Sequence, residues 1–217
     1  MVPLLRRAGL LALALALATR ARDAPRPLAS TVEAKDGRLL ATLDLAPAFP
    51  QDLKRVLSNG LSNVIVLHVA LVPEHGDEPV ALYGREVDVL YDVWEESYTV
   101  TVKDPSNPRG LSRSFRDYEE LHAFLAEARA IDLGSAAELG SKSWVLRTRI
   151  ELNPVSRELL DRTREFIANP AAGGRGGAPS RSVLGAMASY LLRGAEPGAE
   201  VARFESAPFT AREVSTP

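Results

Sequence analysis

The chain contains no cysteine, and this absence removes several classes of structure at once. There can be no disulfide framework, no thiolate zinc site and no lipid attached to an N-terminal cysteine. An excess of basic residues is also missing, because 26 Lys and Arg stand against 28 Asp and Glu, for a formal net charge of −2. This balance argues against nucleic-acid binding, which normally requires a basic face.

Complete catalytic motifs are missing as well. No serine lies in a G-x-S-x-G elbow, and a cysteine nucleophile is excluded. The sequence GGRGG at residues 173–177 lacks the Gly-Lys-Ser/Thr ending of a phosphate-binding loop, so we interpret it as a linker. We therefore assign no catalytic, cofactor-binding or metal-binding residue from motifs alone, and we expect no cofactor.

The first residues have the three-part pattern of a secretory signal. Arg6 and Arg7 precede an unbroken apolar run over residues 8–18, and small residues suited to cleavage follow. The run is shorter than the roughly 20 residues that cross a bilayer comfortably. We predict a signal peptide over residues 1–21 and a protein exported to the periplasm or outside the cell.

Hydrophobic periodicity predicts an α+β fold with an antiparallel sheet of about six strands, able to fold over as a sandwich, and with helices that cover part of it. A helix is expected over residues 51–60, and a longer amphipathic helix over residues 115–131. The strands are expected at residues 29–35, 38–46, 62–73, 81–93, 97–103 and 143–153.

Alternation predicts which side chains of the last two long strands face solvent. In residues 143–153, Trp144 and every second residue after it are expected in the core, while Arg147, Arg149 and Glu151 are expected mostly in solvent. The acids of residues 81–93, including Glu86, are expected on the wetter face of their strand.

Composition divides the chain into four parts: a signal peptide at 1–21, an α+β domain at 28–169, a glycine-rich linker at 170–179 and a C-terminal helix and tail at 180–217. The terminal helix is expected over residues 182–193, and Phe204 and Phe209 are the expected anchors of the tail. Docking on its own domain ranks first for this helix, a partner's groove second and membrane contact third.

The order of these patterns resembles a known family. A helix that ends in LSNGL precedes a long apolar strand, and then REVDVLYDVWEESYTVTV, FRDYEELHAFLAEA and SWVLRTRIELNP follow. Residues 39–169 resemble the bacterial exported family catalogued as domain of unknown function 4390. The resemblance implies an exported bacterial protein, but it supplies no catalytic residues to assign.

Acidic residues cluster around Trp94, namely Asp88, Asp92, Glu95 and Glu96. Close carboxylates could bind a hard cation or act as an acid and base pair. On a strand, however, Asp88 and Asp92 lie about 13 Å apart. We therefore interpret the cluster as the solvated end of a hairpin and expect Trp94 to act as a lid over one edge of the core.

The histidines provide the other candidate chemistry. His75 lies among Glu74, Asp77 and Glu78, a set that could bind a transition metal, although Gly76 and Pro79 favour a tight connecting loop. His68, within an apolar strand, is either a general base or a hydrogen-bonded core residue, and the second is favoured. His122 is expected to be half-exposed on its helix.

Arginines form a modest basic cluster at residues 147, 149, 157, 162 and 164, with acids interleaved. We interpret it as a solvated mixed-charge face. The sequence as a whole favours a non-catalytic envelope module that works through contact with another envelope protein, without nucleic acid. The alternative is a hydrolase or metal-dependent enzyme that uses His68 or His75 with nearby carboxylates.

Overall fold

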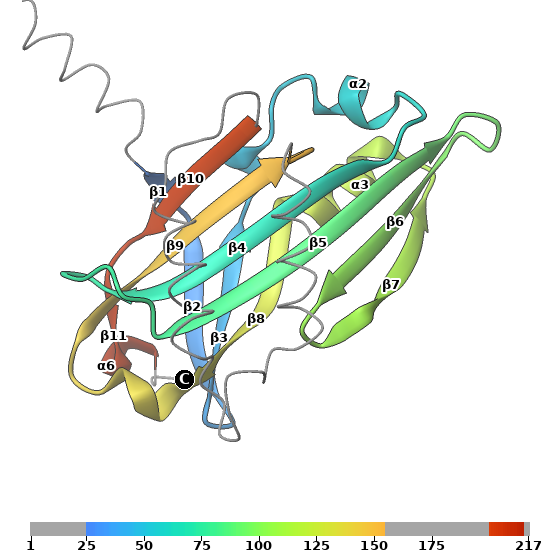
Figure 1. Ribbon diagram of the computed structural model, residues 1–217. Coiled ribbons are helices and arrows are strands. Elements are labelled where there is room, and N and C mark those ends of the chain that lie inside the picture. The colour runs from blue at the N-terminus through green and yellow to red at the C-terminus, as the bar shows by residue number, and fades with distance from the viewer. Residues whose placement is uncertain (1–24, 155–199, 215–217) are drawn as a thin grey trace, which may run out of the picture.

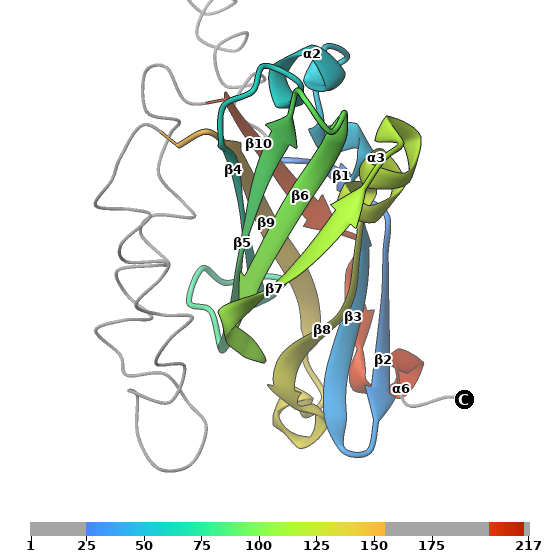
Figure 2. The same ribbon diagram turned by 90° about the vertical axis from the view of Figure 1, so that its right-hand side faces the viewer.

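A computed structural model describes residues 25–154 and 200–214 of the chain. Within these residues, two β-sheets lie face to face as two layers (Figures 1 and 2). The larger sheet, sheet A, has eight strands in the order β1-β10-β9-β4-β5-β6-β7, with β11 paired to β9. The smaller sheet, sheet B, has three strands in the order β2-β3-β8.

The strands of sheet A are β1 (Arg26–Leu28), β4 (Asn63–Pro73), β5 (Ala81–Asp92), β6 (Ser97–Asp104), β7 (Asn107–Phe115), β9 (Ser143–Leu152), β10 (Glu200–Ser206) and β11 (Phe209–Thr210). Those of sheet B are β2 (Ser30–Lys35), β3 (Arg38–Asp44) and β8 (Glu127–Ser135). The described helical segments are η1 (Ala46–Ala48), α2 (Leu53–Leu57), α3 (Tyr118–Ala126), η2 (Ala136–Leu139) and α6 (Ala211–Val214).

The predicted antiparallel sheet is confirmed, and the described part of the chain contains more strands than the six predicted. The six predicted strands correspond to β2, β3, β4, β5, β6 and β9. Pairing is antiparallel throughout, except that β1 runs parallel to β10. Asp36 and Gly37 join β2 to β3 with φ angles of 51° and 75°, as a two-residue Asp-Gly hairpin turn requires.

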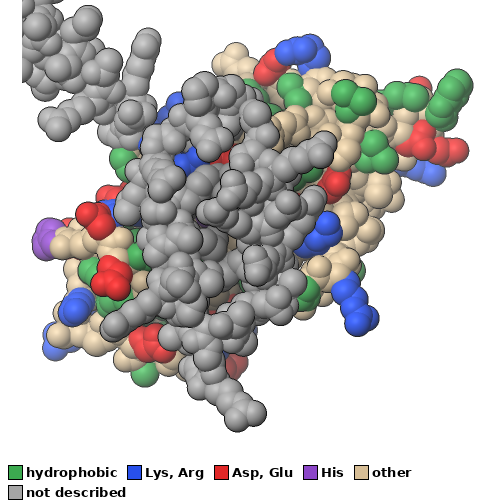
Figure 3. Space-filling view, viewed as in Figure 1, with side chains coloured by type: hydrophobic (Ala, Val, Ile, Leu, Met, Phe, Trp, Pro, Cys, Tyr) green, Lys and Arg blue, Asp and Glu red, His purple; other side chains and the backbone are tan. Residues whose placement is uncertain are grey.

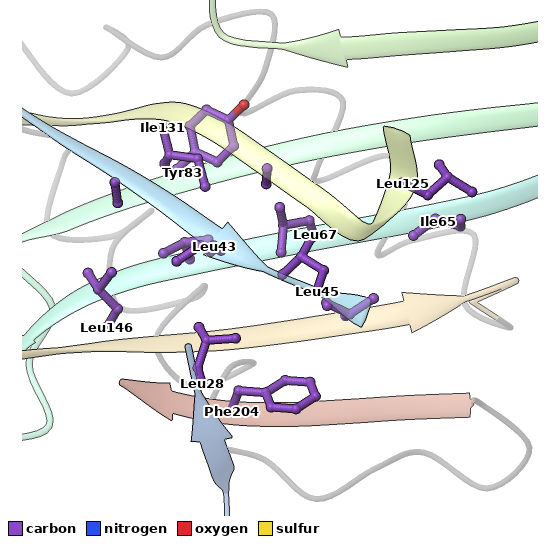
Figure 4. Packing of buried hydrophobic residues seen from close by; sticks show 14 of the residues in the cluster. Leu28, Leu43, Leu45, Ile65, Leu67, Tyr83, Leu125, Ile131, Leu146 and Phe204 are labelled. Carbon is purple, nitrogen blue, oxygen red and sulfur yellow. The ribbon is translucent and has the colours of Figure 1, made fainter. Parts of the chain in front are cut away.

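Alternate residues of the central strands build the core between the sheets. Ile65, Leu67 and Val69 of β4 point toward sheet B and join one buried cluster with Leu39 and Leu43 of β3 (Figure 4). Each of these side chains is nearly inaccessible to water, and full burial of such a side chain contributes about 1.5–3 kcal/mol. This shared core holds the two layers together.

Residues 107–115 form β7 at the edge of sheet A, a strand that is not among the six predicted. Pro108 and Gly110 suggested a loop, but an edge strand tolerates both. Proline has no backbone N–H to donate, and an edge strand tolerates this because one of its sides forms no ladder hydrogen bonds. Gly110 takes a φ of 89° next to a register shift in the β6–β7 ladder.

The helix expected over residues 115–131 is confirmed only in its first part. Asp117 caps α3, since its carboxylate accepts a 2.7 Å hydrogen bond from the Glu119 amide. The helix ends at Ala126, and the chain then continues as β8, which pairs with β3 and buries Ile131 and Leu133. Pairing and burial here override the helical preference of the alanines.

The C-terminal residues that the structure describes complete sheet A. β10 lies beside β9, Phe204 is only 1% exposed and Phe209 is also buried, so the two predicted anchors are confirmed. The expected signal peptide, the linker at 170–179 and the helix at 182–193 lie outside the described residues. The expected end of the domain, at residue 169, also lies outside the described residues.

Candidate functional site

The face of sheet A that is turned away from sheet B carries a row of charged side chains. His68 of β4 lies opposite Arg149 of β9, and Val66 lies opposite both Glu86 and Glu151. All four polar side chains are at most 2% exposed. The expectation that Glu86, Arg149 and Glu151 face solvent is therefore wrong.

Opposite charges are paired along this row, which explains how the strands can bury them. The Arg149 Nε donates to Glu151 Oε1 at 2.7 Å, and Lys103 Nζ lies 3.0 Å from Glu86 Oε1. Alternation in the sequence cannot distinguish buried ion pairs from solvated charges, because both give the same alternation of apolar and charged residues. Buried ions are tolerated only when they are paired in this way.

Arg147 extends the pairing toward the loop and the C-terminal strand. Its guanidinium donates to Asp77 Oδ1 at 2.8 Å and to Glu205 Oε2 at 2.9 Å. Partial burial opposes its charge, but the two carboxylates outweigh this and raise the pKa of Arg147. The basic cluster expected here is thus half-buried at Arg147 and fully buried at Arg149, while residues 157, 162 and 164 lie outside the described residues.

His68 is a neutral imidazole at ordinary pH. Burial, and secondarily the charge of Arg149, lowers the pKa of His68 to about 3. A general base requires a pKa near the working pH and a substrate within hydrogen-bond reach. The position of His68 therefore favours the predicted core histidine over a catalytic one.

The loop between β4 and β5 places His75 and Asp77 in solvent, and Asp77 pairs with Arg147. Within residues 25–154 and 200–214, no group of three or more histidine, aspartate or glutamate side chains is placed to hold a metal ion. His122 is half-buried, as predicted, with its ring 6.2 Å from that of Phe49.

A small apolar cavity lies between sheet A and the junction of α3 with β8. Its volume is about 30 Å³, and its polar lining consists of Arg85 and Glu127. That space suits about one or two water molecules, whereas pockets for small organic ligands begin at about 300 Å³. The cavity is consequently a packing defect of the core rather than a substrate site.

Arg85 borders this cavity as part of a core-facing polar group. Its Nε donates to the Tyr83 hydroxyl at 3.0 Å, and that hydroxyl donates to Asp104 Oδ2 at 3.2 Å. Burial is the main cause that raises the pKa of Tyr83 to about 12. Burial also opposes ionisation of Asp104, but hydrogen bonds from Ser106 and Asn107 outweigh it and lower the pKa of Asp104.

The hairpin between β5 and β6 shows that the acids near Trp94 build a turn. Asp92 Oδ1 accepts hydrogen bonds from the Trp94 amide at 2.8 Å and from the Glu95 amide at 3.1 Å. Glu96 closes the turn with a φ of 47°. The structure thus confirms a hairpin end, and the carboxylate of Asp92 serves the backbone.

Trp94 does not cover the core, and the prediction of a lid is wrong. The side chain is 92% exposed at the tip of the hairpin. Leu61, Leu90 and Val93 are also exposed, and we call these four residues the hairpin-end surface. In Figure 3, apolar side chains gather with acidic ones at this end of the molecule.

The loop after α2 brings Leu61 to this surface. Gly60, with a φ of 76°, lies against Val93, since a Cβ at Gly60 would stand 3.5 Å from Val93 Cγ1. The Ser62 hydroxyl donates to Asp88 Oδ1 at 2.7 Å and fastens the loop to β5. Two segments that are distant in sequence therefore present one apolar surface.

Comparison with family models, with curated proteins and with solved structures gives no significant match. In the described part of the chain, no helix has the length and apolar character needed to cross a bilayer.

Proposed function

We propose that this α+β domain is an exported, non-catalytic binding module that acts through protein contact at the hairpin-end surface. The observation that carries the proposal is Trp94, which is 92% exposed at the tip of a hydrogen-bonded hairpin. Tryptophan is enriched among the residues that dominate the energy of protein interfaces. A rigid turn that presents it costs little conformational entropy on binding.

The neighbours of Trp94 support a protein partner. Leu61, Leu90 and Val93 extend the apolar area, and exposed apolar side chains that cluster with a polar rim are typical of interaction sites. Asp92, Glu95 and Glu96 surround them with negative charge. Because anionic lipid headgroups repel such a rim, a membrane surface fits less well.

The alternative enzyme receives less support from the described residues. His68 is buried in a row of paired charges, and His75 lies in an exposed loop. The cavity between the sheets contains neither histidine. Export is supported by the pattern of the first 21 residues and by the resemblance to an exported family.

A photoreactive p-benzoylphenylalanine in place of Trp94 tests the proposal in cells that export the protein. We expect irradiation to produce an adduct with a protein, and the same amino acid in place of Glu33, exposed on β2, to produce none. Adducts with lipid alone, or no adduct at position 94, would overturn protein contact. An intact Met1 in the cytosolic fraction would overturn export.

A further inference from the structure

The strand β7 presents a second uncovered surface, opposite in charge to the first. Among the described strands it pairs only with β6, at the edge of sheet A, and Leu111 is 58% exposed. Leu111 lies opposite Val102 and so shares the face of sheet A that elsewhere packs against sheet B. Since sheet B has only three strands, this part of the face extends beyond the core (Figure 2).

Arginines surround Leu111. Arg109 and Arg113 lie two residues before and after it, and Arg116 follows the strand. The strand itself contains no acidic residue. We call Arg109, Leu111, Arg113 and Arg116 the β7 surface.

The hairpin-end surface and the β7 surface are complementary. The exposed indole of the first is bordered by Asp92, Glu95 and Glu96, and the second combines an exposed leucine with arginines. Among the ion pairs of the described residues, none involves Glu95, Glu96, Arg109 or Arg116. These opposite charges do not neutralise one another within one copy of the chain.

We infer that the partner of the hairpin-end surface is a second copy of this chain, whose β7 surface receives Trp94. The inference rests on the proposed function, because it requires the hairpin end to bind protein. The indole covers Leu111, an arginine stacks on the ring, and the acids face the remaining arginines. Exposed ion pairs contribute little energy each, so Trp94 and Leu111 supply most of the affinity while charge sets the orientation.

The two surfaces differ, so two arrangements are possible. Two copies can make the contact twice about a two-fold axis, as an isologous dimer, or each copy can make it once, head to tail, in a heterologous chain. In both cases the association depends on protein concentration. It also weakens as salt screens the charges.

Sedimentation velocity of the purified mature protein at micromolar concentration tests the inference. We expect a mass above the monomer in about 0.05 M salt and a weaker association in about 0.5 M salt. Trp94→Ala should raise the dissociation constant about tenfold or more. Lys35→Glu, an exposed reversal on β2, serves as the matched control and should change nothing.

Charge reversal at the two surfaces gives the sharpest result. Glu95→Arg with Glu96→Arg, and separately Arg109→Glu with Arg116→Glu, should each abolish self-association. An equal mixture of the two variants should associate again, because the reversed tip of one meets the reversed β7 surface of the other. Arg113 is left unchanged because it stacks over the Phe115 and Phe124 rings.

All of these substitutions lie at exposed positions, and unchanged thermal unfolding confirms that the variants are folded. A monomer at every concentration, association that is indifferent to Trp94→Ala, or a mixture that stays monomeric would overturn the inference. If the photoreactive residue at position 94 then still captures a different protein, the proposed function stands and only the second copy is wrong. If it captures no protein, both fail.

Discussion

Acidification below pH 6.5 should destabilise the protein through His68. Burial lowers the pKa of this histidine from 6.5 to about 3. Between these values the unfolded chain binds a proton that the folded protein does not, so stability rises with pH across this range. Each pH unit below 6.5 removes about 1.4 kcal/mol, and His68 alone should cost about 2.7 kcal/mol at pH 4.5.

Urea denaturation at a series of pH values from about 7.5 to about 4.5 measures this loss. His68→Gln removes the titrating group. Between pH 7.5 and pH 4.5 the free energy of unfolding of this variant should fall by about 2.7 kcal/mol less than that of the wild type. Ala207→Ser, an exposed change that neither adds nor removes a titrating group, should keep the wild-type dependence. An imidazole at position 68 that titrates near pH 6 by NMR, or an unchanged slope in His68→Gln, would refute the reasoning.

The groups that surround His68 set the limits of this prediction. Arg149 faces it from β9, and Glu86 and Glu151 lie two residues along the neighbouring strands from the positions opposite His68. The lower limit of pH 4.5 keeps Asp104 ionised, since the pKa of that carboxyl is lowered below its usual value of 3.8. Asp104 therefore adds its own loss of stability only at more acidic pH.

Phe204→Ala should cost about 3–5 kcal/mol of unfolding free energy in urea denaturation, because β10 buries this ring in the common core, whereas the exposed Ala207→Ser should cost almost nothing. A small loss in Phe204→Ala would mean that β10 is dispensable. Gly110→Ala should destabilise more than Gly37→Ala, as measured by thermal unfolding. Both glycines have positive φ, but only at Gly110 would a Cβ meet another atom too closely, at 2.8 Å from Thr101 Cγ2. Equal losses would contradict the clash. Arg149→Met should cost about 3–5 kcal/mol because it leaves the buried Glu151 without its partner on β9, and the double variant with Glu151→Leu should recover much of this in the same denaturation assay. Additive losses would show that the pair does not act as a unit.

The sequence predicts strands well where pattern and burial agree. The branched apolar run of β4 and the alternation of β5, β6 and β9 place these strands within one or two residues of their ends. It fails for β7 and β8, for two separate reasons. Pro108 and Gly110 resemble loop residues until an edge position accommodates them, and the alanines of β8 resemble a helix until β3 provides a partner.

The candidate sites show the same division. Local chemistry predicts the turn at Asp92, because the hydrogen bonds that it makes are to amides two and three residues ahead. Nothing local predicts whether Glu86 lies in water or in an ion pair, since Lys103 reaches it only after β5 and β6 have aligned. Arg149 and Glu151 are neighbours on one strand, but alternation alone does not predict that their face of the sheet is buried. The exposure of Trp94 likewise depends on how far the hairpin extends past the core.

The hairpin can expose an indole without weakening the fold because its stability comes from elsewhere. Antiparallel pairing of β5 with β6 continues to Asp92 and Ser97, immediately beside the turn. The rings of Tyr91 and Tyr98 pack across the strands, tilted by 44°, with their centroids 4.7 Å apart. The Tyr98 hydroxyl is in turn 2.6 Å from Ser58 Oγ, which ties the hairpin to the end of α2. These contacts fix the turn through the strands that lead into it and through the end of α2, while Trp94 contributes little to the core. Exposure of so large an apolar side chain to water is unfavourable, and the turn does not depend on Trp94 for its stability. Contact of Trp94 with a partner surface in a complex explains its exposure best.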